Sequence, residues 1–179
     1  MAIPKLLVIS GSLRKGSYNR MLLKEAQTAF GQAEIIEADL NFPLYDGDLE
    51  EAEGVPDDVK TLTDQIKNAD AVVISSPEYN KGITGVLKNA LDWISRVEGM
   101  PFKGKPTVVM SANMGRTGGE TGQFMTISCL IPLQAQIVNG PMLCIATAQN
   151  EFDDNGALTN DHYKKVLSGK MDALRTAIA

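Results

Sequence analysis

A loop that follows the first strand-like run, Leu6 to Ser10, gathers the residue types that bind an anion. It contains the hydroxyl groups of Ser12 and Ser17, the amide of Asn19 and the permanent cation of Arg14. The loop leads into an amphipathic helix, whose N-terminus carries a partial positive charge and several unpaired amide groups. Amide, hydroxyl and guanidinium donors that converge at a helix N-terminus suit a dianionic phosphate.

Two better-known phosphate-binding loops do not fit this segment. Gly11 and Gly16 have the spacing of a P-loop, but Ser17 stands where that loop requires its lysine, so nothing would reach the outer phosphates of a nucleoside triphosphate. The dinucleotide fingerprint G-x-G-x-x-G is absent too, because the residue two positions after Gly11 is Leu13. The loop therefore predicts a cradle for a single phosphate. The alternative is an ordinary strand-to-helix turn in which Ser17 only caps the helix.

A second loop of interest follows the strand-like run Ala71 to Ser75. Pro77 stiffens the exit from the strand, and the glycines of this loop allow a flat ligand to approach closely. Tyr79 could lie against an aromatic ring, while Asn80 could read the polar edge of a heterocycle. Taken alone, the loop also fits plain packing, because an aromatic residue near a helix start more often contacts the core or an interface than a cofactor.

Positioning these loops requires strands that end at the same edge of a sheet. The chain contains apolar runs that are continuous and rich in Val and Ile, a pattern typical of strands covered on both faces. A parallel sheet with helices on each side is therefore expected. The predicted strands are Leu6 to Ser10, Ala71 to Ser75, Thr107 to Ser111 and Met142 to Ala146, with Ala33 to Ala38 as a weaker candidate.

The segments between these runs show the helical period. Apolar faces extend over 22–30, 86–94 and 163–178, and Thr159 is a plausible N-cap for the last helix, with Asp161 in its first turn. Alternating strands and helices give five βα units and a doubly wound sheet. Ligands bind such sheets beyond the carboxyl ends of the strands, which is where both loops lie. Two further long connections are acidic (41–56) and glycine-rich (115–122).

Composition narrows the function classes. The chain has 179 residues, 44% of them hydrophobic, and a formal net charge of −5. These values favour a compact fold and argue against a domain-wide basic surface for nucleic acid. Cys129 and Cys144 form no CxxC pair and are expected to be reduced packing residues. The short apolar run at 6–9 is too brief for a signal or membrane segment, so a cytoplasmic protein is expected.

The two loops together resemble the NADPH-dependent FMN reductase family, most closely its quinone, azo-dye and chromate reductase members. The resemblance extends over nearly the whole chain. It is carried by Gly11-Ser12-Leu13-Arg14 with Ser17 and Asn19, by Pro77-Glu78-Tyr79-Asn80, by the run from Gly85 to Trp93, and by the late segment from Phe152 to Thr159.

This resemblance implies an α/β fold of flavodoxin type: one domain over residues 1–179, in three layers, with a doubly wound five-stranded parallel sheet of order 2-1-3-4-5. It implies FMN as the cofactor. The expected FMN-binding residues are Ser12, Arg14, Ser17, Tyr18 and Asn19 around the phosphate, Pro77, Glu78, Tyr79 and Asn80 beside the isoalloxazine, and Ala112, Asn113 and Gly115 on another side of the ring. Ala112 and Asn113 stand where relatives often carry small hydroxyl residues, so hydrogen bonding there differs.

The activity implied is oxidation of NAD(P)H and transfer of its electrons through FMN, in a ping-pong cycle, to quinones or to chromate, azo dyes or ferric chelates. No side chain need act as a nucleophile, and the sequence contains no convincing acid–base pair. Two alternatives remain open: a flavodoxin-type electron carrier that does not oxidise NAD(P)H itself, and a binding module without redox chemistry.

Several charged and apolar residues have weaker assignments. Arg96 and Arg116 are candidates for steering anionic substrates, although solvated surface positions fit them as well. The lone histidine, His162, is expected at the surface, and no metal site is predicted. By analogy with the family, a homodimer or homotetramer is expected. Met100, Phe102 and Trp93 are candidates for its contact area, and the stretch from Asp46 to Glu53 is expected to be a solvated loop.

Overall fold

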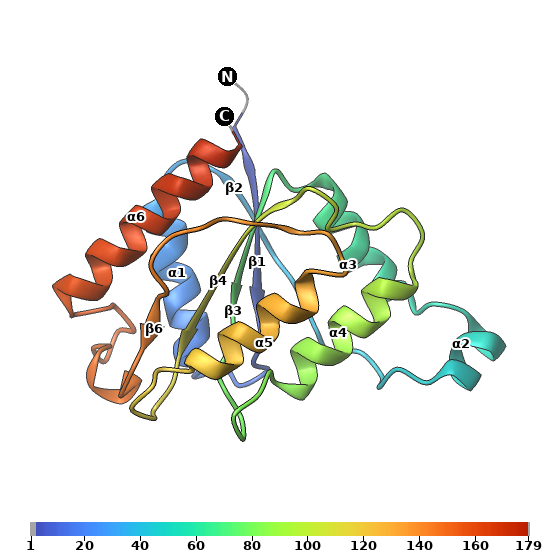
Figure 1. The fold of residues 1–179 in the computed structure, drawn as a ribbon, viewed down its shortest axis with the longest axis horizontal. Coiled ribbons are helices and arrows are strands. Elements are labelled where there is room, and N and C mark those ends of the chain that lie inside the picture. Colours follow the sequence, from blue (N-terminus) through green and yellow to red (C-terminus); the bar gives the residue numbers. More distant parts are fainter. Residues whose placement is uncertain (1–2, 179) are drawn as a thin grey trace.

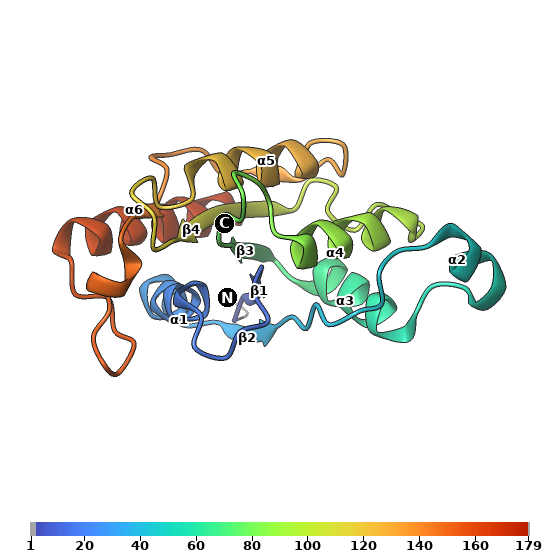
Figure 2. The same cartoon turned by 90° about the horizontal axis from the view of Figure 1, so that it is seen from below.

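The computed structural model describes residues 3–178 and has three layers, with a parallel sheet between two layers of helices (Figures 1 and 2). The strand order is β2-β1-β3-β4-β5, and β6 also pairs with β4. The sequence-based prediction of a flavodoxin-like sheet of order 2-1-3-4-5 is therefore confirmed. The strands are β1 (Lys5–Ser10), β2 (Glu34–Glu37), β3 (Ala71–Ser75), β4 (Pro106–Ala112), β5 (Gln136–Ile137) and β6 (Cys144–Ile145).

The edge beyond β4 consists of two short strands. β5 pairs with the beginning of β4 and β6 with its end, both in parallel. The sequence predicts only the second piece, as Met142 to Ala146. Gly140 and Pro141 lie between the two pieces, and Gly140 has a φ of 148°. Proline cannot donate to a ladder, and such a φ is rarely adopted by other residues, so the edge strand is interrupted here.

The helices lie on both faces of the sheet. α1 and α6 cover one face, and α3, α4 and α5 cover the other, while α2 lies at the end of the molecule farthest from α6 (Figures 1 and 2). Their bounds are α1 (Tyr18–Phe30), α2 (Gly47–Glu53), α3 (Asp57–Asn68), α4 (Gly85–Arg96), α5 (Glu120–Leu130) and α6 (Asp161–Ala177), with a 3₁₀ turn, η1 (Ala148–Asn150). No helix among residues 3–178 is both long enough and apolar enough to cross a membrane.

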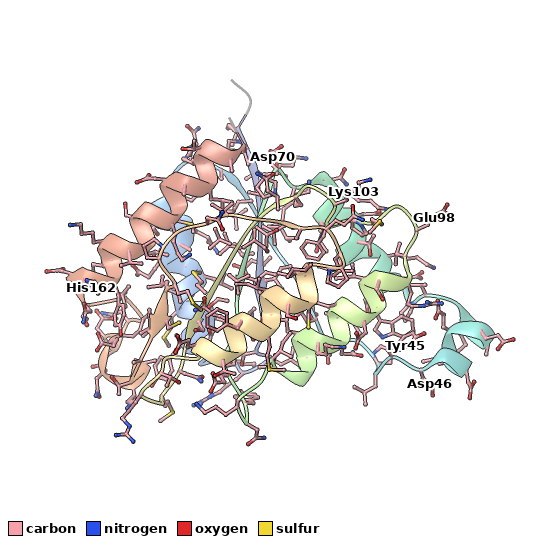
Figure 3. All side chains as sticks on the ribbon, in the orientation of Figure 1. Tyr45, Asp46, Asp70, Glu98, Lys103 and His162 are labelled. Carbon is pink, nitrogen blue, oxygen red and sulfur yellow. The ribbon has the colours of Figure 1, made fainter. Side chains whose placement is uncertain are left out.

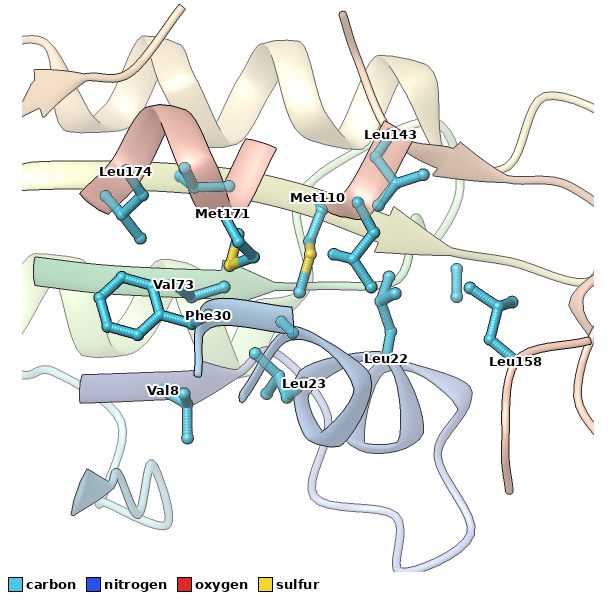
Figure 4. Packing of buried hydrophobic residues seen from close by; sticks show 14 of the residues in the cluster. Val8, Leu22, Leu23, Phe30, Val73, Met110, Leu143, Leu158, Met171 and Leu174 are labelled. Carbon is cyan, nitrogen blue, oxygen red and sulfur yellow. The ribbon is translucent and has the colours of Figure 1, made fainter. Parts of the chain in front are cut away.

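The continuous apolar runs are explained by packing on both faces. Along β3, Val73 faces the α1/α6 layer and Val72 faces the α3/α4/α5 layer. Figure 4 shows the first of these cores, where Phe30 of α1 and Met171 of α6 lie close to Val73. All five residues of β3 are buried, so this strand has no polar face.

The acidic stretch at 46–53 is a helix rather than the expected loop. Asp46 caps α2 by accepting a hydrogen bond from the Asp48 amide at 2.9 Å, and acidic residues in the first turn favour the helix N-terminus. Glu50 then ties α2 to the body of the protein: it forms an ion pair with Arg96 of α4 at 2.9 Å and accepts a hydrogen bond from the Tyr45 hydroxyl. Figure 3 shows Tyr45 and Asp46 at the junction between α2 and the preceding segment.

Three other expectations need correction. Trp93 and Phe102 are fully buried within the chain, and the Trp93 indole N–H donates to the Pro43 carbonyl, so neither residue is available as contact area for a subunit. Asn160, not Thr159, caps α6, because the Thr159 hydroxyl donates instead to the Glu151 carbonyl. Cys129 and Cys144 are free thiols, as expected, but only partly buried.

Candidate cofactor-binding site

A pocket of about 370 Å³ lies where the loops after β1, β3 and β4 meet at the carboxyl ends of these strands. The residues predicted to bind the cofactor line it, with the exception of Asn80. Met114 also lines it, within the loop after β4 that was expected to flank the ring, and so does Gly16, which was not singled out. The lining residues are Ser12, Arg14, Gly16, Ser17, Tyr18, Asn19, Pro77, Glu78, Tyr79, Ala112, Asn113, Met114 and Gly115.

One end of the pocket is formed by the loop from Gly11 to Ser17. A side chain at Gly11 would place its Cβ 2.2 Å from the Ser76 hydroxyl oxygen, so only glycine allows the loops after β1 and β3 to approach this closely. The Ser12 hydroxyl accepts the Arg14 amide at 3.3 Å, and the Ser17 hydroxyl accepts the Asn19 amide at 3.2 Å. Because both hydroxyls act as acceptors within the loop, their protons remain available for an anion's oxygens.

Asn19 was expected to bind the phosphate, but its side chain is hydrogen-bonded to the ends of two strands. Its side-chain amide donates to the Ala112 carbonyl at 2.8 Å, and its oxygen accepts both the Ala112 amide and the Ser75 hydroxyl at 2.9 Å. The residue is 2% exposed. Its side chain therefore joins α1 to the ends of β3 and β4, and we interpret Asn19 as a residue that positions the phosphate loop over these two strands.

The other end of the pocket is walled by a tight hairpin. The backbone amides and carbonyls of Tyr79 and Gly82 bond each other at 3.0 and 3.1 Å, and the two residues between them adopt left-handed conformations with φ of 51° at Asn80 and 63° at Lys81. This geometry is that of a two-residue turn that usually needs asparagine or glycine. Tyr79 is 56% exposed, so it is not a core packing residue, and its ring remains available to a ligand.

Glu78 borders the pocket with its backbone while its side chain points elsewhere. Its carboxylate is buried, accepts the Gly122 amide at 3.0 Å and pairs with the Lys81 ammonium at 3.2 Å. The side-chain amide of Asn113 bonds both the amide and the carbonyl of Glu78, at 3.2 and 3.1 Å. Glu78 and Asn113 together fix the loops after β3 and β4 to each other and to the start of α5.

The pKa of the Glu78 carboxyl is lowered from its ordinary value. Burial acts against the charged form and is the largest single influence, but hydrogen bonds from the Gly122 and Thr121 amides and from Lys81 outweigh it together. The carboxylate also sits at the N-terminus of α5, where no residue of the helix provides a side-chain cap. The charged form is thus favoured both by direct bonds and by the helix dipole.

The two arginines proposed for steering differ in position. Arg96 lies in the last turn of α4, whereas the pocket is next to the first turn of that helix, about 16 Å away for a helix of this length. Its ion pair with Glu50 gives it a role in holding α2. Arg116 is exposed and next in sequence to Gly115, which lines the pocket. His162 is exposed at the start of α6, on the side of the molecule away from α2 (Figure 3).

These features fit a ligand with an anionic tail and a flat, partly polar head. The tail end offers Ser12, Ser17, Arg14 and the Tyr18 amide at the positive end of α1. The head end offers the open wall of Pro77, Tyr79 and Met114. A mononucleotide has this shape, and the donor set matches its monophosphate. The class defined by this fold and pocket is that of the flavodoxin-like, mononucleotide-binding α/β proteins.

Comparison with known proteins narrows this class. Residues 4–150 match the family model described as NADPH-dependent FMN reductase. The chain is 41% identical over 173 residues to an NAD(P)H-dependent FMN reductase of Pseudomonas aeruginosa, covering 96% of this chain and 93% of the relative. It is 37% identical over 179 residues to a quinone reductase of Escherichia coli, covering 94% and 92%. The chain therefore belongs to the NADPH-dependent FMN reductase family, and the resemblance noted in the sequence is confirmed.

A solved structure agrees with this assignment. The flavoenzyme FerB of Paracoccus denitrificans, an NAD(P)H:(acceptor) oxidoreductase, superposes with a TM-score of 0.87 at 32% identity, covering 98% of this chain and 97% of that chain. An archaeal flavodoxin superposes with a TM-score of 0.62 at 11% identity, which reflects the common fold alone. The FMN cofactor and the oxidoreductase class expected from the sequence are those of this family.

The Asn19 side chain is expected to be important for stability. Asn19→Ala removes three hydrogen bonds and leaves the buried Ala112 amide and carbonyl without these partners, so the free energy of unfolding should fall by about 2–3 kcal/mol. Urea unfolding measures this change. Asn155→Ala, at an exposed loop position, is the control and should alter stability by less than about 0.5 kcal/mol. Equal stability of the two variants would contradict the role given to Asn19.

The lowered pKa of Glu78 predicts a pH-dependent contribution to stability. Because the folded pKa lies below the unfolded one, the contribution is complete above about pH 4.3, the ordinary pKa of glutamic acid, and is lost as the pH falls through the folded value. The difference in unfolding free energy between the wild type and Glu78→Gln should therefore be larger at pH 7 than in strong acid. Urea titrations at several pH values test this. Asn155→Ala, an exposed change that removes no titratable group, should show no such trend.

Proposed function

We propose that the chain is an FMN-dependent NAD(P)H:acceptor oxidoreductase that reduces quinones, with chromate, azo dyes and ferric chelates as further acceptors. The observation that supports this most directly is the pocket itself, in which a phosphate cradle at 11–17 continues into an open, aromatic-walled end at 77–79. The names of the relatives agree with this activity, since they include an FMN reductase and quinone reductases.

The residues of the chain have binding and positioning roles in this proposal. Ser12, Ser17, Arg14 and the first amide of α1 hold the phosphate, and the loops fixed by Glu78 and Asn113 border the ring. When bound, FMN supplies a ring that accepts a hydride and passes electrons on, so the protein needs no nucleophile of its own. The exposed wall at Tyr79 leaves one side of the pocket open to a second flat molecule.

The exposure of Tyr79 at one wall of the pocket favours a ping-pong order. The nicotinamide and the acceptor would then bind in turn against this wall. Parallel lines in double-reciprocal plots with NADH or NADPH and a quinone would support this order. Intersecting lines would mean that both substrates bind together.

The rival interpretation as an electron carrier is tested by turnover. A carrier of flavodoxin type would barely oxidise NAD(P)H with a quinone in steady state, whereas the proposed enzyme turns over repeatedly. The interpretation as a non-redox module predicts colourless protein that takes up no flavin. Spectra of the purified protein, followed by steady-state NAD(P)H oxidation, separate the three functions.

Arg14 provides the sharpest test of the phosphate cradle. Arg14→Ala should weaken FMN binding by about 1.5–3 kcal/mol, which is a factor of about 10 to 150, because a charge-assisted contact is lost. Quenching of flavin fluorescence during titration measures the affinity. The matched control is Lys15→Ala in the same loop, because Lys15 lines a different pocket and should affect FMN affinity by less than about threefold. Unchanged affinity in Arg14→Ala would contradict the cradle.

We also propose that the chain forms a homodimer or a homotetramer. α5 is apolar on its outer side as well as its inner side: Phe124 is 57% exposed, Ile131 is 65% exposed, and Met125 beside them is 41% exposed. An apolar groove of about 510 Å³ runs between α4 and α5 and includes Met100, which was expected to contribute contact area. Exposed apolar side chains gathered on one helix, together with this groove, support an interface here.

The outer face of α5 gives a prediction for the oligomeric state. Phe124→Asp should lower the mass measured by light scattering after size exclusion, because it places a charge within the apolar face. Leu44→Asp is the control, since Leu44 is 79% exposed but lies outside this face. If the wild type is already a monomer at micromolar concentration, or if both variants behave as it does, this interface is wrong.

A further inference from the structure

The loop between β1 and α1 separates two pockets that face different sides. Arg14 lines the candidate cofactor pocket, whereas its neighbour Lys15 lines another pocket of about 240 Å³. This second pocket lies between α1 and the carboxyl ends of β1 and β2. Figure 2 shows α1 beside the edge strand β2. The proposed FMN site uses none of the residues that form it.

Positive charge is concentrated in the second pocket. Lys15, Arg20 and Lys24 line it, and Glu37 at the end of β2 is its single acidic residue. Within residues 3–178, none of the three cations forms an ion pair with any carboxylate. Arg20 and Lys24 are also four residues apart on α1, a like-charge spacing that destabilises a helix in the absence of an anion.

Arg20 supplies a second, independent observation. Its Nε atom is buried and has no hydrogen-bond partner among the described residues. A buried charged donor without a partner costs more than an ordinary lost hydrogen bond. Such a group is expected where a ligand provides the acceptor.

The remaining lining residues indicate the size and type of the ligand. Val8, Leu23 and Ala38 are the apolar lining residues, and Gln27 and Glu37 add polar groups other than the cations. A carboxylate accepts hydrogen bonds from hydroxyl groups and repels phosphate, so it suits a sugar rather than a second anion.

We propose that this pocket is a second anion site that binds a phosphomonoester of about the size of a sugar phosphate. The phosphate contacts Lys15, Arg20 and Lys24, and the hydroxyl groups of the ligand contact Glu37. The phosphomonoester is either a free metabolite or the 2′-phosphate end of NADPH, which carries the same group on a ribose. The site shares no lining residue with the FMN pocket, so binding of a free phosphomonoester is independent of the proposed function, whereas its assignment to NADPH rests on that function.

Titration of the FMN-loaded protein with inorganic phosphate and with ribose 5-phosphate, followed by amide chemical shifts in two-dimensional NMR, tests the site. Shifts should concentrate at Lys24, Gln27 and Ala38, and ribose 5-phosphate should bind more tightly than phosphate. Arg20→Gln should weaken binding at least about tenfold, as expected for loss of a charge-assisted contact. Lys165→Gln, an exposed change on α6, is the matched control and should leave binding unchanged.

A comparison of NADH and NADPH separates the two sources of the phosphomonoester. If Arg20→Gln raises KM for NADPH alone, the ligand is the 2′-phosphate of the nicotinamide nucleotide; if neither KM changes while ribose 5-phosphate binding is lost, it is a free metabolite. Absence of localised shifts in the wild type, or equal affinity in Arg20→Gln, overturns the proposal.

The same titration distinguishes failure of this site from failure of the proposed function. If the chain does not retain FMN, free phosphate can also occupy the cradle at Arg14. Shifts at 12–19 would then disappear in Arg14→Ala, while those at Gln27 and Ala38 would persist.

Discussion

The geometry of the candidate site depends on one buried amide, that of Asn19. The loops after three parallel strands lie at the same edge of the sheet. The sheet alone, however, does not determine the position of α1, the helix that follows β1. Asn19 does this by bonding both backbone groups of Ala112 and the hydroxyl of Ser75. Its position in the first turn of α1 places the positive end of the helix dipole beside the carboxyl ends of β3 and β4. A buried amide that makes only some of its hydrogen bonds is costly, so the three bonds of Asn19 are expected to form together.

At the opposite end of the pocket, a second set of contacts fixes the loops after β3 and β4. These contacts leave the pocket wall at Tyr79 exposed. Asn113 joins the backbone of Glu78, and the Glu78 carboxylate binds the start of α5, so two loops and a helix are fixed without any side chain filling the pocket. Gly122 permits this, since a Cβ there would lie 3.1 Å from that of Glu78. The contacts of Glu78 and Asn113 hold the loops, while the Tyr79 side chain remains exposed. Such a division suits the proposed ping-pong order, in which two flat molecules would bind in succession.

Continuous apolar runs and loop composition are local signals, and they predicted a doubly wound parallel sheet and a phosphate-binding loop after its first strand. The strand order and most of the pocket residues were implied by the family resemblance. The predictions from sequence failed for features that depend on tertiary contacts. Nothing in the residue type of Asn19 or Glu78 indicates that the side chain points to the sheet or to α5 rather than to a ligand. The strand β5 is two residues long and therefore too short for a periodic signal. The helix α2 is acidic throughout, and its docking depends on Arg96, which lies 46 residues later than Glu50.

The β1–α1 loop contributes one cation to each of the two pockets beside it. Arg14 lines the candidate cofactor pocket, and the next residue, Lys15, lines the second pocket. The helix continues this division: Asn19 turns toward the sheet, and the face with Arg20 and Lys24 turns toward β2. If this face of α1 were an ordinary solvent-exposed face, its charged groups would all contact water. Burial of the Arg20 Nε atom between α1 and the sheet edge is the feature that such a face does not explain.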